Sequence, residues 1–415
     1  MSVLRPSRAQ ARALGCRLAL PPELQREFAV VEFALPGKEE LGNVLDNIAA
    51  SANLTKPDGE ERELLLDAAS GLTSIEAENA LALSVVECGK LLPTVVAREK
   101  ANEVKKGGLL EVCPSIPTLG EIGGLDQLKS WLLQRRDAFG TEAQKYRLPS
   151  PKGLLIVGIP GTGKSLTAKA TASVFNRPLL KLDAGQLFAG VVGQSESNMR
   201  SVIATTEAIA PCVLWVDELE KGFSGAKSSG VSDGGTASRV LGTLLSWLQD
   251  RRAPVFVVAT ANDVTQLPPE LLRKGRFDEL FFVDLPSQEE REAIWRIQIS
   301  KYARSHEKFD VAQLAKATEG LTGSEIEQLF IDALHEAFCR RDEPTDLSIA
   351  MLVTDVVPLS RLMSEQIDAL RKWAKGRARL ATKPDAQSSQ RKVTAGGARR
   401  EGAEPAISGT QQTMR

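Results

Sequence analysis

The sequence predicts an α/β protein in which a parallel β-sheet is covered by helices on both faces and followed by an all-helical lid. Short apolar runs alternate with longer segments of helical periodicity between residues 153 and 303. That alternation argues for a parallel sheet with helices on both faces. From residue 308 to 343 the apolar residues recur at i, i+3 and i+4, which indicates helices alone.

The individual elements follow from this pattern. The expected strands are the apolar runs at residues 153–157, 178–182, 212–217, 254–260 and 280–284. The expected helices of the same unit lie at residues 164–175, 195–209, 236–250 and 288–303. Two further helices, from Phe309 to Ala317 and from Ser324 to Arg340, belong to the predicted lid.

The composition allows two or three domains and excludes several classes of protein. Of the 415 residues, 42% are hydrophobic, and the formal net charge of −1 implies no general attraction to nucleic acid or membranes. Five cysteines without a C-x-x-C pair and only two histidines argue against a zinc site. Scattered cysteines favour a reducing compartment, so we expect a cytoplasmic protein, and no apolar run approaches the roughly 18 residues of a transmembrane helix.

A glycine-rich loop between the first strand and the first helix fits the pattern G-x-x-x-x-G-K-[ST], which binds the phosphates of nucleotides. Its residues are Gly158, Ile159, Pro160, Gly161, Thr162, Gly163, Lys164 and Ser165, and Leu166 follows in the helix. Glycines let backbone N–H groups turn toward an anion, and the helix N-terminus adds partial positive charge. We expect Lys164 to reach the β- and γ-phosphates and Ser165 to ligate Mg²⁺.

Two carboxylates end the third predicted strand, and an amide follows the fourth. Asp217 is expected to hold Mg²⁺, directly or through water, and Glu218 is expected to polarise the attacking water. The carboxyl edge of a parallel sheet is where ligands bind, which places both beside the phosphate loop. Asn262 could donate to the γ-phosphate or orient the water, although an ordinary strand-end turn also explains it.

A short stretch after the fourth strand carries three cations and a glycine. Arg273 and Arg276 are candidates for arginine fingers, which would reach the γ-phosphate bound by a neighbouring subunit. For Lys274, a surface salt bridge is the simpler interpretation.

Two co-linear patterns indicate that part of the chain is duplicated. Leu20–Leu24 matches Leu267–Leu271, and Gly71–Thr73 matches Gly320–Thr322, in each case about 250 residues apart. We therefore expect residues 1–105 to be a partial, degenerate copy that consists of a final strand and a helical lid. The other expected units are a nucleotide-binding α/β domain at 106–303, the lid and C-terminal helices at 304–383, and a disordered tail at 384–415.

Together these motifs resemble the classical AAA subgroup of ring ATPases, from about Ile122 to about Phe338. The resemblance implies ATP and Mg²⁺ as cofactors, hydrolysis of ATP, and a homo-oligomeric ring that is by family habit a hexamer. It makes hydrolysis depend on assembly, because each subunit offers arginines to its neighbour.

The resemblance also implies roles for single residues. Gly124, in the motif Ile122–Leu125, and the lid residue Gly323 would lie near the adenine, and Asn262 would act as a sensor of the γ-phosphate. Arg273 and Arg276 would be the arginine fingers.

One motif departs from the subgroup. Its members carry an aromatic–apolar–glycine tripeptide that grips substrate in the central pore, whereas this chain has Val191-Val192-Gly193. Processive threading of polypeptide is therefore in question, and Gly222–Gly235 corresponds to a second pore loop. More narrowly, the half-degenerate duplication and the stretch from Pro358 to Ala374 resemble a little-characterised AAA family of cyanobacteria and algal plastid genomes.

Three interpretations of function remain open at this point. The first is a ring-forming ATPase that remodels or regulates a protein partner. The second is a nucleotide-gated regulatory scaffold with little mechanical output, which Val191 and the incomplete first copy favour. The third is a nucleic-acid-associated ATPase that uses the basic residues 371–400, although a solvated tail explains them more simply. No membrane partner is expected, and an algal source would place the protein in the plastid stroma.

Overall fold

The computed structural model describes residues 35–106, 108–113, 116–188, 194–222, 234–273 and 275–383. Several sequence-based predictions fall on other residues and lie outside the described ones. They are the first-copy pattern at 20–34, the Val191 tripeptide, most of the second pore loop, Lys274 and the tail at 384–415.

A seven-stranded sheet forms the centre of the described chain, with the strand order β1-β3-β4-β5-β2-β6-β7. Neighbouring strands run parallel except β1 and β3, which are antiparallel. The strands are β1 (Leu110–Val112), β2 (Gly153–Gly158), β3 (Leu179–Asp183), β4 (Cys212–Asp217), β5 (Val255–Ala261), β6 (Glu279–Val283) and β7 (Arg379–Leu380). The predicted α/β class with a largely parallel sheet is confirmed, and the edge strands β1 and β7 are additions to it.

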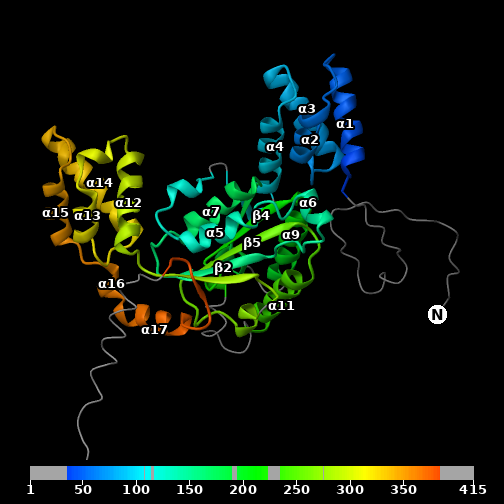
Figure 1. Cartoon of the computed structure of the whole chain (residues 1–415). Coiled ribbons are helices and arrows are strands. Elements are labelled where there is room, and N and C mark those ends of the chain that lie inside the picture. The colour runs from blue at the N-terminus through cyan, green and yellow to red at the C-terminus, as the bar shows by residue number, and fades with distance from the viewer. Residues whose placement is uncertain are drawn as a thin grey trace, which may run out of the picture.

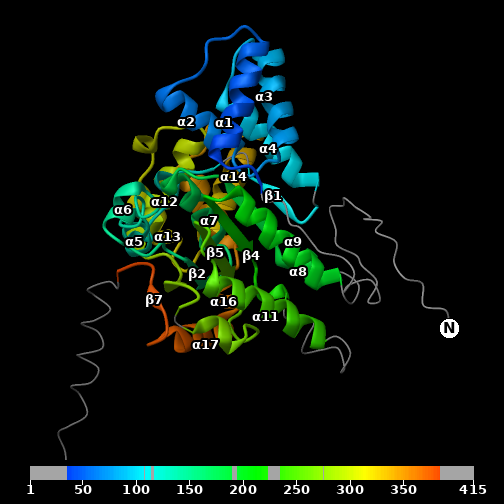
Figure 2. The ribbon, with the colours of Figure 1, turned by 90° about the vertical axis from the view of Figure 1, so that its right-hand side faces the viewer.

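Side chains alternate along the strands between two cores, one on each face of the sheet. Ile156 and Trp215 belong to the core on one face, whereas their neighbours Val157 and Val216 belong to the other. The first face is covered by α5 (Asp126–Leu133) and α7 (Lys164–Phe175). The second is covered by α8 (Ala184–Phe188), α9 (Gln194–Ile209), α11 (Gly234–Asp250) and α17 (Ser364–Ala374), as Figures 1 and 2 show. Burial on both faces explains why the strands read as continuous apolar runs.

A separate helical unit, the lid, follows β6 and has its own core (Figure 1). It consists of α12 (Gln288–Lys301), α13 (Val311–Ala317), α14 (Gly323–Arg340) and α15 (Asp346–Asp355). Trp295 and Phe330 meet edge to face at its centre, with ring centroids 6.0 Å apart. Trp295 belongs to α12, which lies before residue 303, the expected end of the α/β domain. That domain boundary stays a prediction.

Four helices precede the sheet and pack around a core of their own. They are α1 (Lys38–Ser51), α2 (Gly59–Ala69), α3 (Ser74–Cys88) and α4 (Pro93–Lys106). Figure 1 shows them above the sheet, where α4 contacts the edge strand β1. A short helix, α6 (Thr141–Lys145), lies between α5 and β2.

The start of α3 repeats the start of α14. Gly71 and Gly320 have φ angles of +87° and +83°, a left-handed conformation that favours glycine. Thr73 and Thr322 are the N-caps, and each forms a capping box with the glutamate three residues later. The duplicated Gly-Leu-Thr pattern therefore produces the same helix start in both helical units.

After the lid, α16 (Leu359–Leu362) and α17 return the chain to the sheet, where β7 lies beside β6. In the described part of the chain no single helix has the length and apolarity to cross a bilayer. One bent pair, Asp346–Leu362 with Ser364–Ala374, meets the requirement on length and composition alone, with 52° between its halves.

The core beneath α5 gives a test of the packing. Phe281 is fully buried and lies edge-on to Trp131, with ring centroids 5.7 Å apart. We expect Phe281→Ala to lower the free energy of unfolding of the α/β unit by about 3–5 kcal/mol, because it leaves a cavity. Urea denaturation followed by tryptophan fluorescence measures this. Tyr146→Ala, at a side chain that is 85% exposed, is the control and should stay within about 0.5 kcal/mol of wild type.

Candidate functional site

The site lies where the neighbouring strands β2, β5 and β4 end at the same edge of the sheet. A cavity of about 480 Å³ opens there between the sheet and the lid. It is lined by the segment before α5, the phosphate loop and start of α7, the ends of β4 and β5, and the helices α12 and α14. The lining residues are Glu121, Ile122, Gly123, Pro160, Gly161, Thr162, Gly163, Lys164, Ser165, Leu166, Asp217, Glu218, Thr260, Asn262, Ile294, Ile297, Gln298, Gly323, Ser324 and Glu327.

The phosphate loop joins β2 to α7 as the sequence predicts. Gly161 and Gly163 have φ angles of +77° and +88°, so both use the conformational freedom that only glycine has without strain. Helix α7 begins at Lys164, and its first amides have no acceptor within the helix. The turn therefore presents N–H groups and the positive end of a helix dipole to the cavity.

Lys164 is buried at the base of the loop, with 6% of its surface exposed. Its ammonium donates to the carbonyl oxygens of Gly158 and Ile159, at 2.9 and 2.7 Å. Burial lowers the pKa of Lys164 to about 8, and the nearby carboxylates of Glu220, Asp217 and Glu218 oppose this. An anion bound in the cavity would stabilise the ammonium further.

Ser165 and Asp217, the two predicted Mg²⁺ ligands, lie together. Ser165 Oγ is 3.5 Å from Asp217 Oδ1, and Thr260 Oγ1 donates to the same oxygen at 2.8 Å. Thr260 lies on β5, between β4, which ends at Asp217, and β2, which leads into the loop before Ser165. Among the described residues no group of three or more Asp, Glu, His or Cys side chains could hold a metal. A Mg²⁺ ion at this pair would take further ligands from phosphate and water, as Mg²⁺ commonly does.

Glu218 and Asn262 face each other across the ends of β4 and β5. Asn262 Nδ2 donates to Glu218 Oε1 at 3.3 Å, and Lys221 forms an ion pair with the same carboxylate. Glu218 has φ of +46°, and its N–H donates to Thr260 Oγ1 at 3.2 Å. A non-glycine residue held in this conformation is strained, and such strain clusters at functional sites.

Glu220 supports this pair and was not singled out from the sequence. It is 5% exposed, and its Oε1 accepts the backbone N–H of Asn262 at 2.9 Å. Its Oε2 has no hydrogen-bond partner among the described residues, and burial raises the pKa of the carboxyl group. In the sequence, only its position three residues after Asp217 indicates that Glu220 belongs to the site. An acidic residue at that spacing could equally lie on the surface.

Two residues of the Ile122–Leu125 motif, Ile122 and Gly123, also line the cavity. A Cβ at Gly123 would lie 2.4 Å from Ile294 Cγ1, so the motif packs directly on α12. Gly124 has φ of +71°, and a Cβ there would lie 2.1 Å from Glu290 Oε1. Two glycines are therefore required for the motif to contact the lid this closely.

The lid also touches the phosphate loop directly. Ser324 donates through its N–H and its hydroxyl to Gly161 O, at 3.1 and 3.3 Å. Gly323, predicted to face the adenine, lies at the start of α14 and lines the cavity. A change in the angle of the lid would move this wall relative to the loop.

The predicted residues divide by position. Pro160 to Leu166, Asp217, Glu218, Asn262 and Gly323 line the cavity, whereas Gly158, Ile159 and Gly124 are not among its lining residues. Arg273 and Arg276 do not line it. Arg273 is exposed beside a second pocket with Trp373 and Arg377 of the C-terminal segment, and Arg276 Nη1 is buried without a hydrogen-bond partner among the described residues.

Comparison with protein families identifies two regions. A model of the ATPase family associated with various cellular activities (AAA) matches residues 154–285, which span β2 to β6. A model of the second domain of SpoVK-like AAA ATPases matches residues 39–107, which span α1 to α4.

Individual relatives extend over most of the chain. The uncharacterised AAA domain-containing proteins ycf46 of Pyropia yezoensis and Trieres chinensis are 41% and 42% identical over 375 residues. Each alignment covers 89% of this chain and 75% of the relative. The ATP-dependent zinc metalloprotease FtsH 2 of Bdellovibrio bacteriovorus is 30% identical over 265 residues, which is 61% of this chain and 43% of that protein. Both the AAA resemblance and the narrower resemblance to an algal-plastid family are confirmed.

The buried loop lysine gives a test of the site. We expect Lys164 to titrate near pH 8, and tripolyphosphate to raise its pKa because the anion stabilises the ammonium. Binding of tripolyphosphate should then weaken as the pH rises above 8. NMR of ¹³C-methylated lysines measures this, and Lys164→Arg identifies the signal. A signal that titrates near the ordinary value of 10.5 would contradict the burial of this side chain.

Proposed function

Because this chain belongs to the ycf46 family of AAA ATPases, we propose that it hydrolyses ATP with Mg²⁺ in a homo-oligomeric ring that acts on a protein partner. The observation that carries the proposal is the meeting of Asp217 and Glu218 with Ser165 and Asn262 at one sheet edge. Binding alone would need only the phosphate loop. A carboxylate pair at this edge adds the groups that hydrolysis requires.

The loop would bind the triphosphate and the other residues would orient it. Backbone amides after Gly161 and the ammonium of Lys164 would hold the β- and γ-phosphates. Ser165 and Asp217 would hold Mg²⁺, which neutralises phosphate charge when bound. The name of the FtsH 2 relative, an ATP-dependent enzyme, supports ATP as the nucleotide.

Glu218 would orient the attacking water and accept its proton. The amide of Asn262 contacts the Glu218 carboxylate, and Glu220 fixes the backbone of Asn262. These contacts support a role for Asn262 as the sensor of the γ-phosphate. A γ-phosphate that binds the Asn262 amide would alter the hydrogen bond between Asn262 and Glu218.

Assembly would complete the site. Arg273 is exposed and neither it nor Arg276 lines the cavity of its own chain, which supports their action on a neighbouring subunit. AAA proteins usually work as oligomers, and a hexamer is the state we propose. We further propose a protein as the partner and, by analogy with the algal relatives, the cytoplasm or the plastid stroma as the location.

Glu218→Gln tests the assignment of the base. We expect the variant to bind ATP but to hydrolyse it at least about a hundredfold more slowly, because the amide cannot accept the proton. Steady-state phosphate release and binding of a fluorescent ATP analogue measure the two properties. Glu319→Gln, at an exposed lid residue away from the cavity, is the matched control. Hydrolysis at the wild-type rate by the Glu218 variant would sink the assignment.

Arg276→Ala tests the action between subunits. Turnover should fall about a thousandfold, the usual contribution of an arginine finger, while the oligomer persists. Light scattering coupled to size exclusion follows assembly, and phosphate release follows turnover. Arg136→Ala, at an exposed arginine paired with Asp137, serves as the control. Normal turnover in assembled Arg276→Ala would exclude this residue as a finger.

A further inference from the structure

The segment from Leu359 to Thr382, here called the C-terminal strap, contacts both the lid and the sheet, between which the cavity lies. It comprises α16, α17 and β7 and runs from the lid back to the sheet. At its start, Leu359 N–H donates to Glu325 Oε1 of the lid at 2.7 Å. At its end, Ala381 donates to Phe282 O at 2.9 Å and so extends the sheet.

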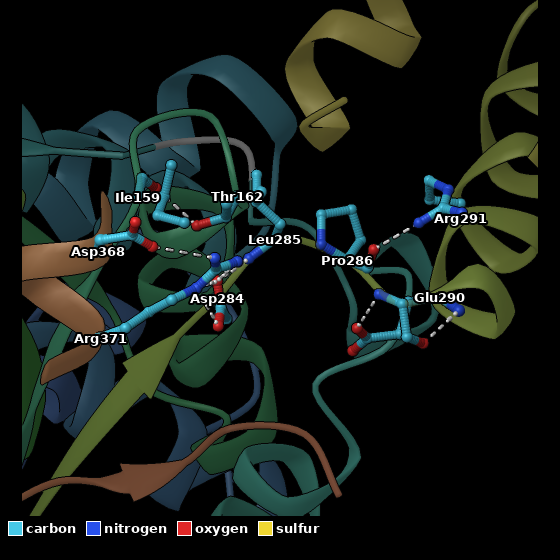
Figure 3. Close-up of polar contacts among 10 residues, drawn as sticks. Ile159, Thr162, Asp284, Leu285, Pro286, Glu290, Arg291, Asp368 and Arg371 are labelled. Carbon is cyan, nitrogen blue, oxygen red and sulfur yellow. Dashed lines mark hydrogen bonds and ion pairs between the residues drawn. The ribbon is translucent and has the colours of Figure 1, made fainter. Parts of the chain in front are cut away.

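One contact lies on the link between the sheet and the lid, residues 284–287. Figure 3 shows Arg371 of α17 against Asp284, the first residue of this link. Arg371 Nε and Nη2 donate to the two carboxylate oxygens at distances from 2.8 to 3.0 Å. Such two-pronged pairing fixes orientation as well as distance. Asp284 Oδ1 also accepts the N–H of Leu285, so the pair is joined to the backbone of the link.

A second contact lies at the far end of the link. Glu290, which Figure 3 labels, lies in the first turn of α12 and accepts the N–H of Ser287 at 3.0 Å. Its other oxygen accepts the hydroxyl of Thr382 at 2.6 Å and the N–H of Leu125 at 2.8 Å. The strap and the Ile122–Leu125 motif are therefore both hydrogen-bonded to the Glu290 carboxylate of the lid helix α12.

We propose that the strap sets the angle between the sheet and the lid, with Arg371 and Thr382 as positioning residues for ATP. The proposal rests on the function proposed above and deepens it. Arg371 holds the sheet side of the link and Thr382 holds the lid side. A short link fastened at both ends has little freedom to rotate.

The composition of the cavity explains why this angle matters. The lid supplies Ile294, Ile297, Gln298, Gly323, Ser324 and Glu327 to the lining. Asp217, Glu218 and the phosphate loop belong to the sheet unit and do not move with the lid. Loss of the strap contacts would lower the fraction of molecules with a closed cavity, and the apparent affinity for ATP falls with that fraction.

Arg371→Ala in the Glu218→Gln protein tests the proposal directly. We expect the Kd for a fluorescent ATP analogue to rise about threefold to tenfold, because a half-exposed ion pair shifts the closed fraction by that order. With Glu218 intact, KM should rise by the same factor and kcat should stay within about twofold, since the hydrolytic groups are on the sheet. Lys372→Ala, at the exposed neighbouring residue, is the matched control and should change neither value.

Thr382→Val is a second, independent test, because it removes the hydroxyl that donates to Glu290 with little change in side-chain shape. Its Kd should also rise, and hydrogen exchange of peptide 284–301, which contains the link and α12, should accelerate in both variants without loss of the thermal transition. An unchanged Kd and unchanged exchange in both folded variants would overturn the proposal. Failure of the Glu218→Gln parent to bind ATP would instead overturn the proposed function, and this inference with it.

Discussion

The carboxylate of Glu290 joins three parts of the chain that are far apart in sequence, and the cavity depends on that junction. It is 7% exposed and accepts hydrogen bonds from Leu125, Ser287 and Thr382. A buried carboxylate that lost such donors would cost several kcal/mol, so the three segments stabilise one another. Gly124 is constrained by the same group, since any side chain there would overlap it.

Much of the fold follows from local patterns. The strands β2 to β6 agree with the predicted runs within about two residues, because burial on both faces produces continuous apolar segments. The phosphate loop is recognisable because its residues lie together between Gly158 and Ser165, and Asp217 and Glu218 because they end an apolar strand. Their meeting at one edge follows from the parallel direction of the strands.

The remaining features depend on contacts that no local pattern encodes. Thr260 reaches Asp217 because β5 lies between β2 and β4, and a single sequence does not specify strand order. Glu220 is defined only by its contact with Asn262, 42 residues away. Strand β7 has two residues, too few for a periodic pattern in the sequence. Only its parallel pairing with β6 defines it as a strand. The buried side chains of helix α17 pack on the sheet, a long-range contact that the local sequence pattern does not specify.

The position of the strap at the end of the described chain has a consequence for biosynthesis. The first amides of α5, at Gln127 and Leu128, donate to Ala381 O, and the side chain of Gln127 reaches Thr382, 255 residues later. During translation the sheet and lid can form while this acceptor is still within or before the ribosome tunnel. The start of α5 is therefore completed only after almost the whole described chain has emerged. Strands β1 to β6 can therefore pair during synthesis before the amides of Gln127 and Leu128 gain this acceptor.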